Sequence, residues 1–327
     1  MKFLKNYFKV AWRNLIKNKA ASIINIGGLA VGMAVALQIG LWINDELSFN
    51  KNFENYNRIA KVIQNVTNNG EVQTWTSVPY PLAEDLRKNY GSDFKRVVLE
   101  ASPGDHILAH EEKKFTRQGG FFENDAPEMF SLKMLRGSRT LTDPSFILIS
   151  ESTAIAYFGK DNPLNKLMKI DNQFTVKVSG VFEDFPRNSS FANLSFMSTW
   201  DLIYTQTDWI KTMENPWRPN AFTVYVELND HADITKVSAR IKDAKLKKVN
   251  AQLAKKKPAL FLQPMRDWHL YAEYKNGVNT GGAIQYVRMF GIIGIFVLLL
   301  ACINFMNLST ARSEKRAKEV GIRKTMG

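Results

Sequence analysis

Two long stretches without a charged residue constrain this chain more than any other feature. The first covers the 25 residues from Ala20 to Asn44, and the second covers the 23 residues from Met289 to Ala311. Because about 20 helical residues cross the roughly 30 Å hydrocarbon core of a bilayer, each stretch can span a membrane. The alternative is a buried core helix, but core helices of this length rarely lack every charge. The sequence therefore predicts transmembrane helices at residues 20–44 and 284–311.

A cleaved signal peptide is a second alternative for the first stretch, because basic residues precede it. The run is longer than the roughly 7–15 apolar residues of a signal peptide. It also ends at Trp42, Ile43 and Asn44 rather than at a small-residue cleavage site. We therefore expect the first stretch to remain as an anchor.

The net charge of +13 is concentrated at the two ends of the chain. Residues 1–19 hold six basic and no acidic residues, and residues 288–327 hold seven basic and two acidic ones. Because lysine-rich and arginine-rich flanks stay in the cytoplasm, both ends are predicted to be cytoplasmic and residues 45–283 to be exported. In a bacterium with two membranes, this topology places the chain in the inner membrane and its exported domain in the periplasm. The nearly balanced remainder offers no basic stripe for nucleic acid, so no nucleic-acid partner is expected.

Residues 1–19 have the pattern of an amphipathic helix on the cytoplasmic side. Bulky apolar residues such as Phe3, Tyr7 and Trp12 alternate with lysines such as Lys5 and Lys9. A solvated helix is the alternative, but aromatic and basic residues together favour a helix that lies on membrane lipids.

Small residues recur every four positions in the first span. Gly28, Gly32, Ala36 and Gly40 share one helix stripe, where another helix can approach closely. The alternative is the general enrichment of glycine in membrane helices. We expect this stripe to be a helix-packing surface.

Four polar side chains fall at membrane depth, and polar groups there generally face protein rather than lipid. No acidic or basic residue accompanies them, so hydrogen bonds between helices are favoured over a substrate pathway. The four are Asn25, Gln38, Asn304 and Asn307.

Strand-like and helix-like stretches alternate between residues 57 and 264, which predicts a mixed α/β or α+β domain. The clearest signal is a strand at Phe146–Ile149, a cap at Ser150 and a helix at Glu151–Phe158 that ends before Gly159. A hairpin is expected to follow, with strands at residues 167–170 and 173–178. The loop-rich residues 186–219 are a candidate for an inserted subdomain.

The residue patterns of common catalytic sites do not occur in the sequence. The phosphate-binding GxxxxGK[ST] loop, GxSxG and HExxH are all missing. His106 and His110, followed by Glu111, could be metal ligands, but Gly104 and the charged run favour a surface loop. His269 is expected to be a packing residue. We therefore predict no catalytic, cofactor-binding or metal-binding residue and no cofactor.

Several segments resemble a known family. The second span and its tail, CINFMNLSTAR at 302–312 and RAKEVGIRKTMG at 316–327, resemble the FtsX-like permease domain. The segments FSLKMLRG at 130–137, LISES at 148–152 and VSGVFEDFP at 178–186 resemble the MacB-type periplasmic core domain. The resemblance covers essentially the whole chain. The chain is similar in particular to the long permeases of Bacteroidetes-like bacteria.

This resemblance implies the non-catalytic permease subunit of an ABC transporter that pairs with a separate cytoplasmic ATPase. It implies efflux, or lipoprotein or cell-envelope handling, and a second permease copy in a dimer. A periplasmic adaptor or lipoprotein is a further candidate partner. The family's coupling segment corresponds to residues 312–327, with Glu319, Arg323 and Lys324 as expected ATPase contacts. Since the chain stops within this motif, we expect a truncated permease.

Two other kinds of protein share parts of this pattern. A two-span periplasmic sensor receptor has the same topology, but a signalling helix or kinase module should follow its second span. A membrane-anchored enzyme would need a catalytic site, for which the sequence offers no candidate. Neither the substrate nor the partner ATPase can be derived from the sequence.

Overall fold

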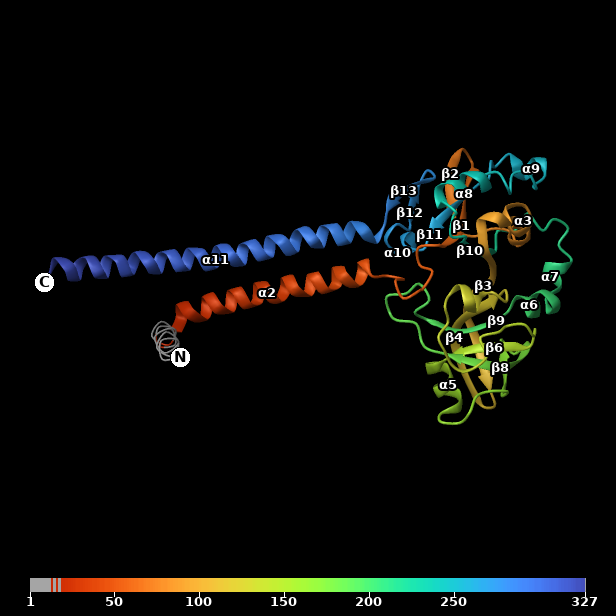
Figure 1. Cartoon of the computed structure of the whole chain (residues 1–327), viewed down its shortest axis with the longest axis horizontal. Coiled ribbons are helices and arrows are strands. Elements are labelled where there is room, and N and C mark those ends of the chain that lie inside the picture. Colours follow the sequence, from red (N-terminus) through yellow and green to blue (C-terminus); the bar gives the residue numbers. More distant parts are fainter. Residues whose placement is uncertain (1–12, 14–15, 17–18, 327) are drawn as a thin grey trace. The chain divides into compact units, whose positions relative to one another are not determined.

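Two long helices and one mixed α+β domain make up the part of the chain that the computed structural model describes, residues 13, 16 and 19–326 (Figure 1). The helices form one compact unit, residues 1–47 with 284–327, and residues 48–283 form the other. The predicted amphipathic helix at residues 1–19 lies almost entirely outside the described residues. The predicted fold class, an α+β domain between two long apolar helices, is confirmed.

Helices α2 (Lys19–Leu47) and α11 (Ala283–Thr325) contain the two predicted spans. An 18-residue stretch within Ser22–Leu47 of α2 has a mean hydropathy of 1.9, and one within Ala283–Asn307 of α11 has a mean hydropathy of 2.5. Only 6% of each of these two 18-residue stretches is buried. A core helix of a soluble protein would be mostly buried, so the structure favours the membrane-spanning interpretation.

One large mixed sheet, with 11 strands within residues 19–326, organises the domain. Its main order is β11-β1-β10-β3-β4-β9-β6-β8-β5, while β2 pairs with β1, and β7 pairs with β3 and β8. The strands are β1 (Ile59–Asn68), β2 (Glu71–Trp75), β3 (Phe94–His110), β4 (Lys113–Phe122), β5 (Met134–Gly137), β6 (Phe146–Ser150), β7 (Leu167–Ile170), β8 (Phe174–Phe182), β9 (Leu194–Thr199), β10 (Phe222–Leu228) and β11 (Ala259–Pro264). A separate hairpin consists of β12 (Glu273–Lys275) and β13 (Val278–Gly281).

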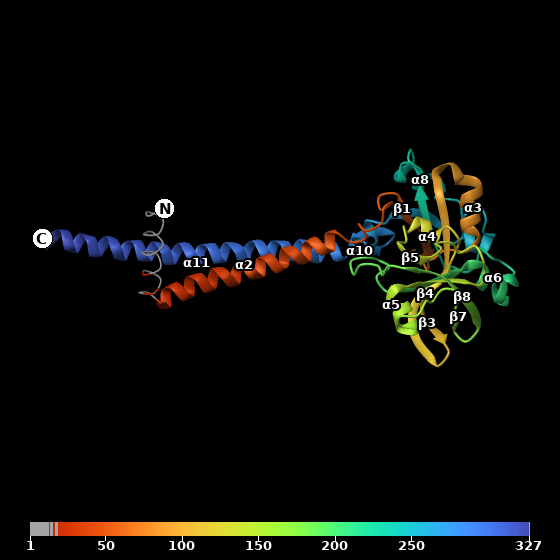
Figure 2. The ribbon, with the colours of Figure 1, turned by 60° about the horizontal axis from the view of Figure 1, so that its bottom comes forward.

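The long strand β3 belongs to both halves of this sheet (Figures 1 and 2). Its first half pairs with β10, and its second half pairs with β4 and β7. The register with β4 shifts between Ala101 and Gly104, where Ser102 has φ 48° and Gly104 has φ 144°. Residues that carry a side chain rarely adopt such a φ, so glycine suits this bulge. The bulge bends β3 between its two halves.

Local signals place the elements around β6 as the sequence predicted. The hydroxyl of Ser150 accepts a hydrogen bond from the backbone N–H of Thr153, and helix α5 (Glu151–Phe158) ends at Gly159, which has φ 62°. The predicted hairpin is β7 with β8, in register Ile170 opposite Phe174. Buried and exposed residues alternate at the start of β8, as the sequence pattern requires.

The other helices of the domain are short. In α8, the carboxylate of Asp233 accepts a hydrogen bond from the N–H of Lys236 and caps the first turn. These helices are α3 (Pro81–Tyr90), the 3-10 turn η1 (Gly91–Asp93), α4 (Ala126–Met129), α6 (Trp200–Gln206), α7 (Asp208–Lys211), α8 (Ile234–Ile241), α9 (Ala251–Ala254) and α10 (Asp267–Leu270).

Residues 186–219, the candidate for an inserted subdomain, contribute to the main sheet instead. Their strand β9 lies between β4, to which it is parallel, and β6, to which it is antiparallel. The segment therefore belongs to the same compact unit as the rest of residues 48–283.

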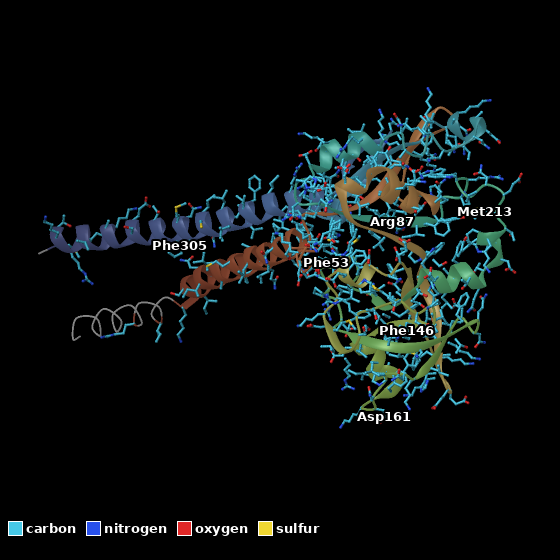
Figure 3. The ribbon with its side chains drawn as sticks, turned by 45° about the vertical axis from the view of Figure 1, so that its right-hand side comes forward. Phe53, Arg87, Phe146, Asp161, Met213 and Phe305 are labelled. Carbon is cyan, nitrogen blue, oxygen red and sulfur yellow. The ribbon has the colours of Figure 1, made fainter. Side chains whose placement is uncertain are left out.

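Both faces of the sheet are buried. Along β6, Ile147 and Ile149 pack in one apolar cluster, and Leu148 between them packs in another. Because successive side chains of a strand point to opposite faces, the two clusters lie on opposite sides of the sheet. Phe53, labelled in Figure 3, belongs to the second cluster, and its ring lies 6.3 Å from that of Phe130.

Candidate functional site

Helices α2 and α11 pack together along one stripe of α2. Its buried and half-buried positions recur at alternating steps of three and four residues, a period of about 3.5 that is typical of left-handed helix packing. The ring of Trp42, next to this stripe, meets that of Phe290 edge to face at 5.0 Å. The stripe consists of Ser22, Asn25, Leu29, Gly32, Ala36, Ile39 and Ile43.

The closest approach of the two helices is at Gly32. A Cβ atom added there would lie 2.5 Å from the Cβ of Ala301, so no larger side chain fits without a shift of the helices. A Cβ at Gly28 would lie 3.0 Å from the amide nitrogen of Asn304, whereas one at Gly40 would have no atom within 4 Å. Ala36 is half-buried.

The predicted four-residue stripe is therefore only partly on the contact face. Each step of four residues rotates about 40° around a helix with 3.6 residues per turn, so the stripe winds away from α11. Gly40 is exposed, and the packing role of the four small residues together stays a prediction.

Two of the four polar residues predicted to face protein lie toward the partner helix. Asn25 is 9% exposed, and Asn304 is half-buried beside Gly28, whereas Gln38 and Asn307 are exposed. Within the described part of the chain, the side-chain oxygen of Asn25 has no hydrogen-bond partner. The expected bonds between helices are therefore not formed by this oxygen.

The segment expected to contact an ATPase is the end of α11 rather than a separate helix. This helix continues from the apolar part, which ends at Asn307, to Thr325. Its backbone places Glu319 and Arg323 one turn apart, and the side chains of Arg323 and Lys324 are exposed. Val320 is also exposed, at 64%, so this tip combines basic and apolar side chains.

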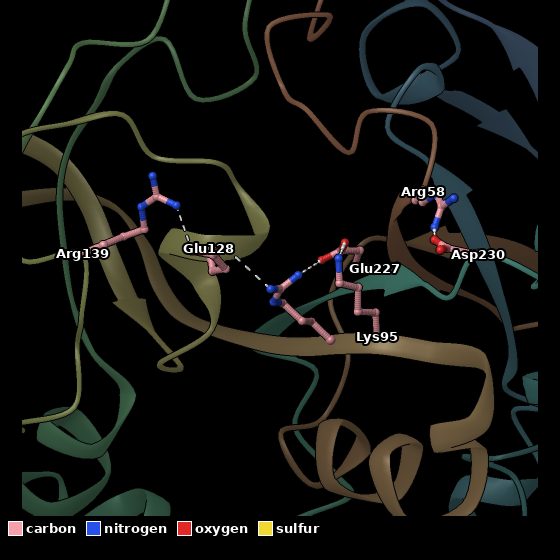
Figure 4. A network of polar contacts seen from close by, with 7 residues as sticks. Arg58, Lys95, Glu128, Arg139, Glu227 and Asp230 are labelled. Carbon is pink, nitrogen blue, oxygen red and sulfur yellow. Dashed lines mark hydrogen bonds and ion pairs between the residues drawn. The ribbon is translucent and has the colours of Figure 1, made fainter.

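A chain of ion pairs joins three elements of the domain (Figure 4). The carboxylate of Glu227 on β10 is fully buried and lies 2.6 Å from the guanidinium of Arg96 and 3.3 Å from the ammonium of Lys95, both on β3. Arg96 also reaches Glu128 in α4 at 3.8 Å, and Arg139 reaches the same carboxylate at 2.8 Å. Removing one partner of a buried ion pair costs about 3–5 kcal/mol, so the pairs of Glu227 hold β3 and β10 together, whereas those of Glu128, whose side chain is 53% exposed, add little.

A buried carboxyl group lies where β3 pairs with strands on both sides. Glu100 is opposite Thr223 of β10 and Phe122 of β4. The hydroxyl of Tyr225 donates a hydrogen bond to its carboxylate at 2.8 Å. Burial raises the pKa of Glu100 to about 7, and both this hydrogen bond and the charge of Lys61 oppose the rise. No local pattern around Glu100 predicts this group, because its burial depends on three strands that meet only in the fold.

His106, His110 and His269 are held by contacts within the domain. His106 lies on β3, so the expected surface loop is wrong. Its Nδ1 lies 2.6 Å from Asp171, and its Nε2 lies 2.8 Å from the carbonyl oxygen of Ser102. His269 stacks on Phe49 with ring centroids 3.8 Å apart, which confirms its expected packing role. Within residues 19–326, no three His, Cys, Asp or Glu side chains are grouped to hold a metal ion.

Open pockets of the domain lie beside exposed strands. One of about 570 Å³ lies between α8 and β11, and one of about 640 Å³ lies beside β7 and the turn after β3. Their linings hold no serine or cysteine next to a histidine base, the pairing that nucleophilic catalysis uses.

Comparisons with known proteins agree with this architecture. Residues 22–244 match the family model of the MacB-like periplasmic core domain. A crystal structure of a domain of a protein assigned as a permease, from Porphyromonas gingivalis, has a TM-score of 0.55 at 18% identity and covers 72% of this chain and 98% of its own. At this identity the likeness shows a shared fold.

Two further solved structures are more distant. The periplasmic region of MacB from Actinobacillus actinomycetemcomitans has a TM-score of 0.45 at 18% identity, over 63% of this chain and 88% of its own. The extracellular domain of the noncanonic ABC-type transporter YknZ from Gram-positive bacteria has a TM-score of 0.45 at 18% identity, over 62% and 99%. No curated protein matches the chain.

Proposed function

The chain belongs to the family of the MacB-like periplasmic core domain, and we propose that it couples ATP hydrolysis by a separate cytoplasmic ATPase to motion of this domain. It is a permease of the ABC-transporter type. The proposed task is efflux, or lipoprotein or cell-envelope handling. The observation that carries the coupling proposal is the continuation of α11, as a basic helix, beyond its apolar part.

The charge distribution supports the proposed orientation. Basic residues precede α2 and cover the end of α11, and such flanks stay in the cytoplasm. The domain between the two helices would then lie in the periplasm, on the side opposite the ATPase. The basic flanks of α2 and α11 would then lie in the cytoplasm, on the same side of the membrane as the ATPase.

The tip of α11 has the chemistry of a docking surface. Arg323 and Lys324 are exposed and available to acidic groups of a partner. Val320 and Ile322 are 64% and 56% exposed, and such apolar side chains gain stability when a partner covers them. A flank that only sets orientation would need the charges but not the apolar residues.

The chain connects the domain to both helices directly. Helix α2 ends at Leu47 and the domain begins at Ser48, while the domain ends at Ala283, the first residue of α11.

Charge reversal at the tip tests the coupling. The tagged protein carrying Arg323→Glu and Lys324→Glu is purified from the host's membranes, and the ATP hydrolysis that co-purifies is measured. We expect this hydrolysis to fall, because like charges across an interface oppose binding. The matched control is Lys255→Glu with Lys257→Glu, two exposed lysines of the domain, which should leave it unchanged.

The same purification separates the permease from a two-span sensor receptor. A receptor would bring no ATP-hydrolysing subunit with it. Equal ATP hydrolysis with the tip variant and the wild type, both inserted in the membrane, would contradict the coupling role of this segment.

A further inference from the structure

Five aromatic rings form one cluster around the start of β10. Phe222, only 2% exposed, lies at its base. The rings of Tyr80 and Trp200 lie 5.6 and 5.7 Å from it, and Trp209 stacks on it at 6.2 Å with an interplanar angle of 23°. Tyr204 completes the cluster, 5.4 Å from Trp200. The rings come from the segment before α3, from α6, from α7 and from β10.

Two of these rings remain open to solvent. Trp209 is 51% exposed and Tyr204 is 37% exposed. Single exposed aromatic residues are common, but here two adjoin three other rings in one patch. Tryptophan and tyrosine are enriched among the few residues that carry most of the binding energy in protein interfaces.

An acidic pocket shares Trp200 with this patch. Its volume is about 320 Å³, and Glu123, Asp125 and Asp201 are among its lining residues, together with Arg87. Figure 3 labels Arg87, on α3, and Met213, in the loop after α7. The lining is mostly polar, with Trp200 as its one aromatic side chain.

The charges of the pocket are unequally compensated. Arg87 pairs with Glu123 and donates to the carbonyl oxygen of Val97 at 2.9 Å. Glu123 also accepts from the N–H of Leu99 at 2.7 Å, so its carboxylate is well engaged. Within residues 19–326, the carboxylates of Asp125 and Asp201 form no hydrogen bond or ion pair.

We propose that this surface binds a basic segment of a partner protein, with an ammonium or guanidinium group between Asp125, Asp201 and the ring of Trp200. An adjoining apolar or aromatic side chain of the segment covers Tyr204 and Trp209. A cation over an indole face is attracted by the ring, and the two free carboxylates complement its charge. An acidic partner would meet two uncompensated negative charges. The inference concerns the domain alone and stands apart from ATPase coupling.

Three tripeptides test the proposal: Arg-Trp-Arg, Glu-Trp-Glu and Arg-Ala-Arg. Binding to the full chain in nanodiscs of neutral phosphatidylcholine is measured by calorimetry, and empty nanodiscs give the background. We expect Arg-Trp-Arg to bind most tightly and to weaken as salt is added, because salt screens exposed charge pairs. Arg-Ala-Arg lacks the ring and Glu-Trp-Glu carries the wrong charge, so both should bind more weakly.

Variants separate the two parts of the surface. Asp125→Asn with Asp201→Asn should weaken Arg-Trp-Arg about fivefold to twentyfold, the effect of two partly exposed ion pairs. Trp209→Ala should weaken it about threefold to tenfold through lost aromatic contact. The control is Asp105→Asn with Asp161→Asn, two exposed acids outside the pocket, which should have no effect.

Circular dichroism checks that each variant is folded. The proposal is wrong if Arg-Trp-Arg shows no saturable binding to the chain or if Glu-Trp-Glu binds as tightly. It is equally wrong if the pocket variant and the control variant give the same affinity.

Discussion

Replacing Glu100 by glutamine should stabilise the domain at alkaline pH. The side chain is buried on β3, and burial raises its pKa from an ordinary value of 4.5 to about 7. Glutamine has nearly the same shape, and its carbonyl oxygen can still accept the hydrogen bond from Tyr225. The variant therefore removes the buried charge and keeps the contact.

The sign follows from proton binding. Between pH 4.5 and about 7 the folded protein holds a proton on Glu100 that the unfolded chain has released, so stability falls as pH rises through this range. The two pKa values differ by about 2.5, and 1.36 kcal/mol for each unit gives a loss of about 3 kcal/mol above the folded pKa. Glu100→Gln should be more stable than the wild type by up to this amount at about pH 8 and similar to it at about pH 4.

Urea unfolding of the full chain in detergent micelles, followed by tryptophan fluorescence across a pH series, measures this difference. Other buried carboxyls also titrate, including Glu123, whose pKa burial raises. The difference between wild type and variant isolates Glu100 from them. Tyr225→Phe is the companion variant, because loss of its hydroxyl should raise the pKa of Glu100 further and shift the fall to higher pH. Parallel stability curves for wild type and Glu100→Gln would refute the reasoning.

Gly32→Leu should lower the yield of a disulfide between Trp42→Cys and Phe290→Cys in an otherwise cysteine-free chain, because the larger side chain separates the helices at an overpacking cost of about 1–3 kcal/mol. Gly40→Leu, where the added side chain meets open space, should leave this yield unchanged, and an equal drop for both would show that Gly32 is no contact. Ser150→Ala should lower the free energy of unfolding by about 1 kcal/mol in urea titrations through loss of the cap of α5, and an unchanged value would mean that the cap contributes nothing.

Local sequence signals predicted the elements whose residues interact within one turn or hairpin. The strand, cap and helix at 146–158 depend on Ser150 and Gly159, which act on their immediate neighbours. Strand β9 was missed, because its place depends on parallel pairing with β4, some 75 residues earlier in the chain, and such distant pairing leaves no local pattern. The loop expected at His106 was wrong because Gly104, a turn residue, serves a bulge within β3 instead.

In the candidate site, too, features that depend on local composition were predicted, and features that depend on distant segments were not. Length and charge were enough to find the two apolar helices and their basic flanks, since both are properties of composition. The packing face of α2 was only partly found, because its period is near 3.5 and the glycines repeat every four residues. The pocket between Asp125 and Asp201 could not be predicted, since its walls come from segments spread along the chain from Arg87 to Asp201.

The membrane topology is the most direct test of the central claim, that two spans carry an exported domain and return the chain to the cytoplasm. Cys302 is replaced by alanine, and single cysteines are introduced at Asn68, Asp230 or Lys318. The positions in the domain should react with a membrane-impermeant maleimide in intact cells, whereas Lys318→Cys should react only after the inner membrane is opened. Labelling of Lys318→Cys in intact cells, or protection of the cysteines at positions 68 and 230, would contradict the topology and with it the proposed contact with a cytoplasmic ATPase.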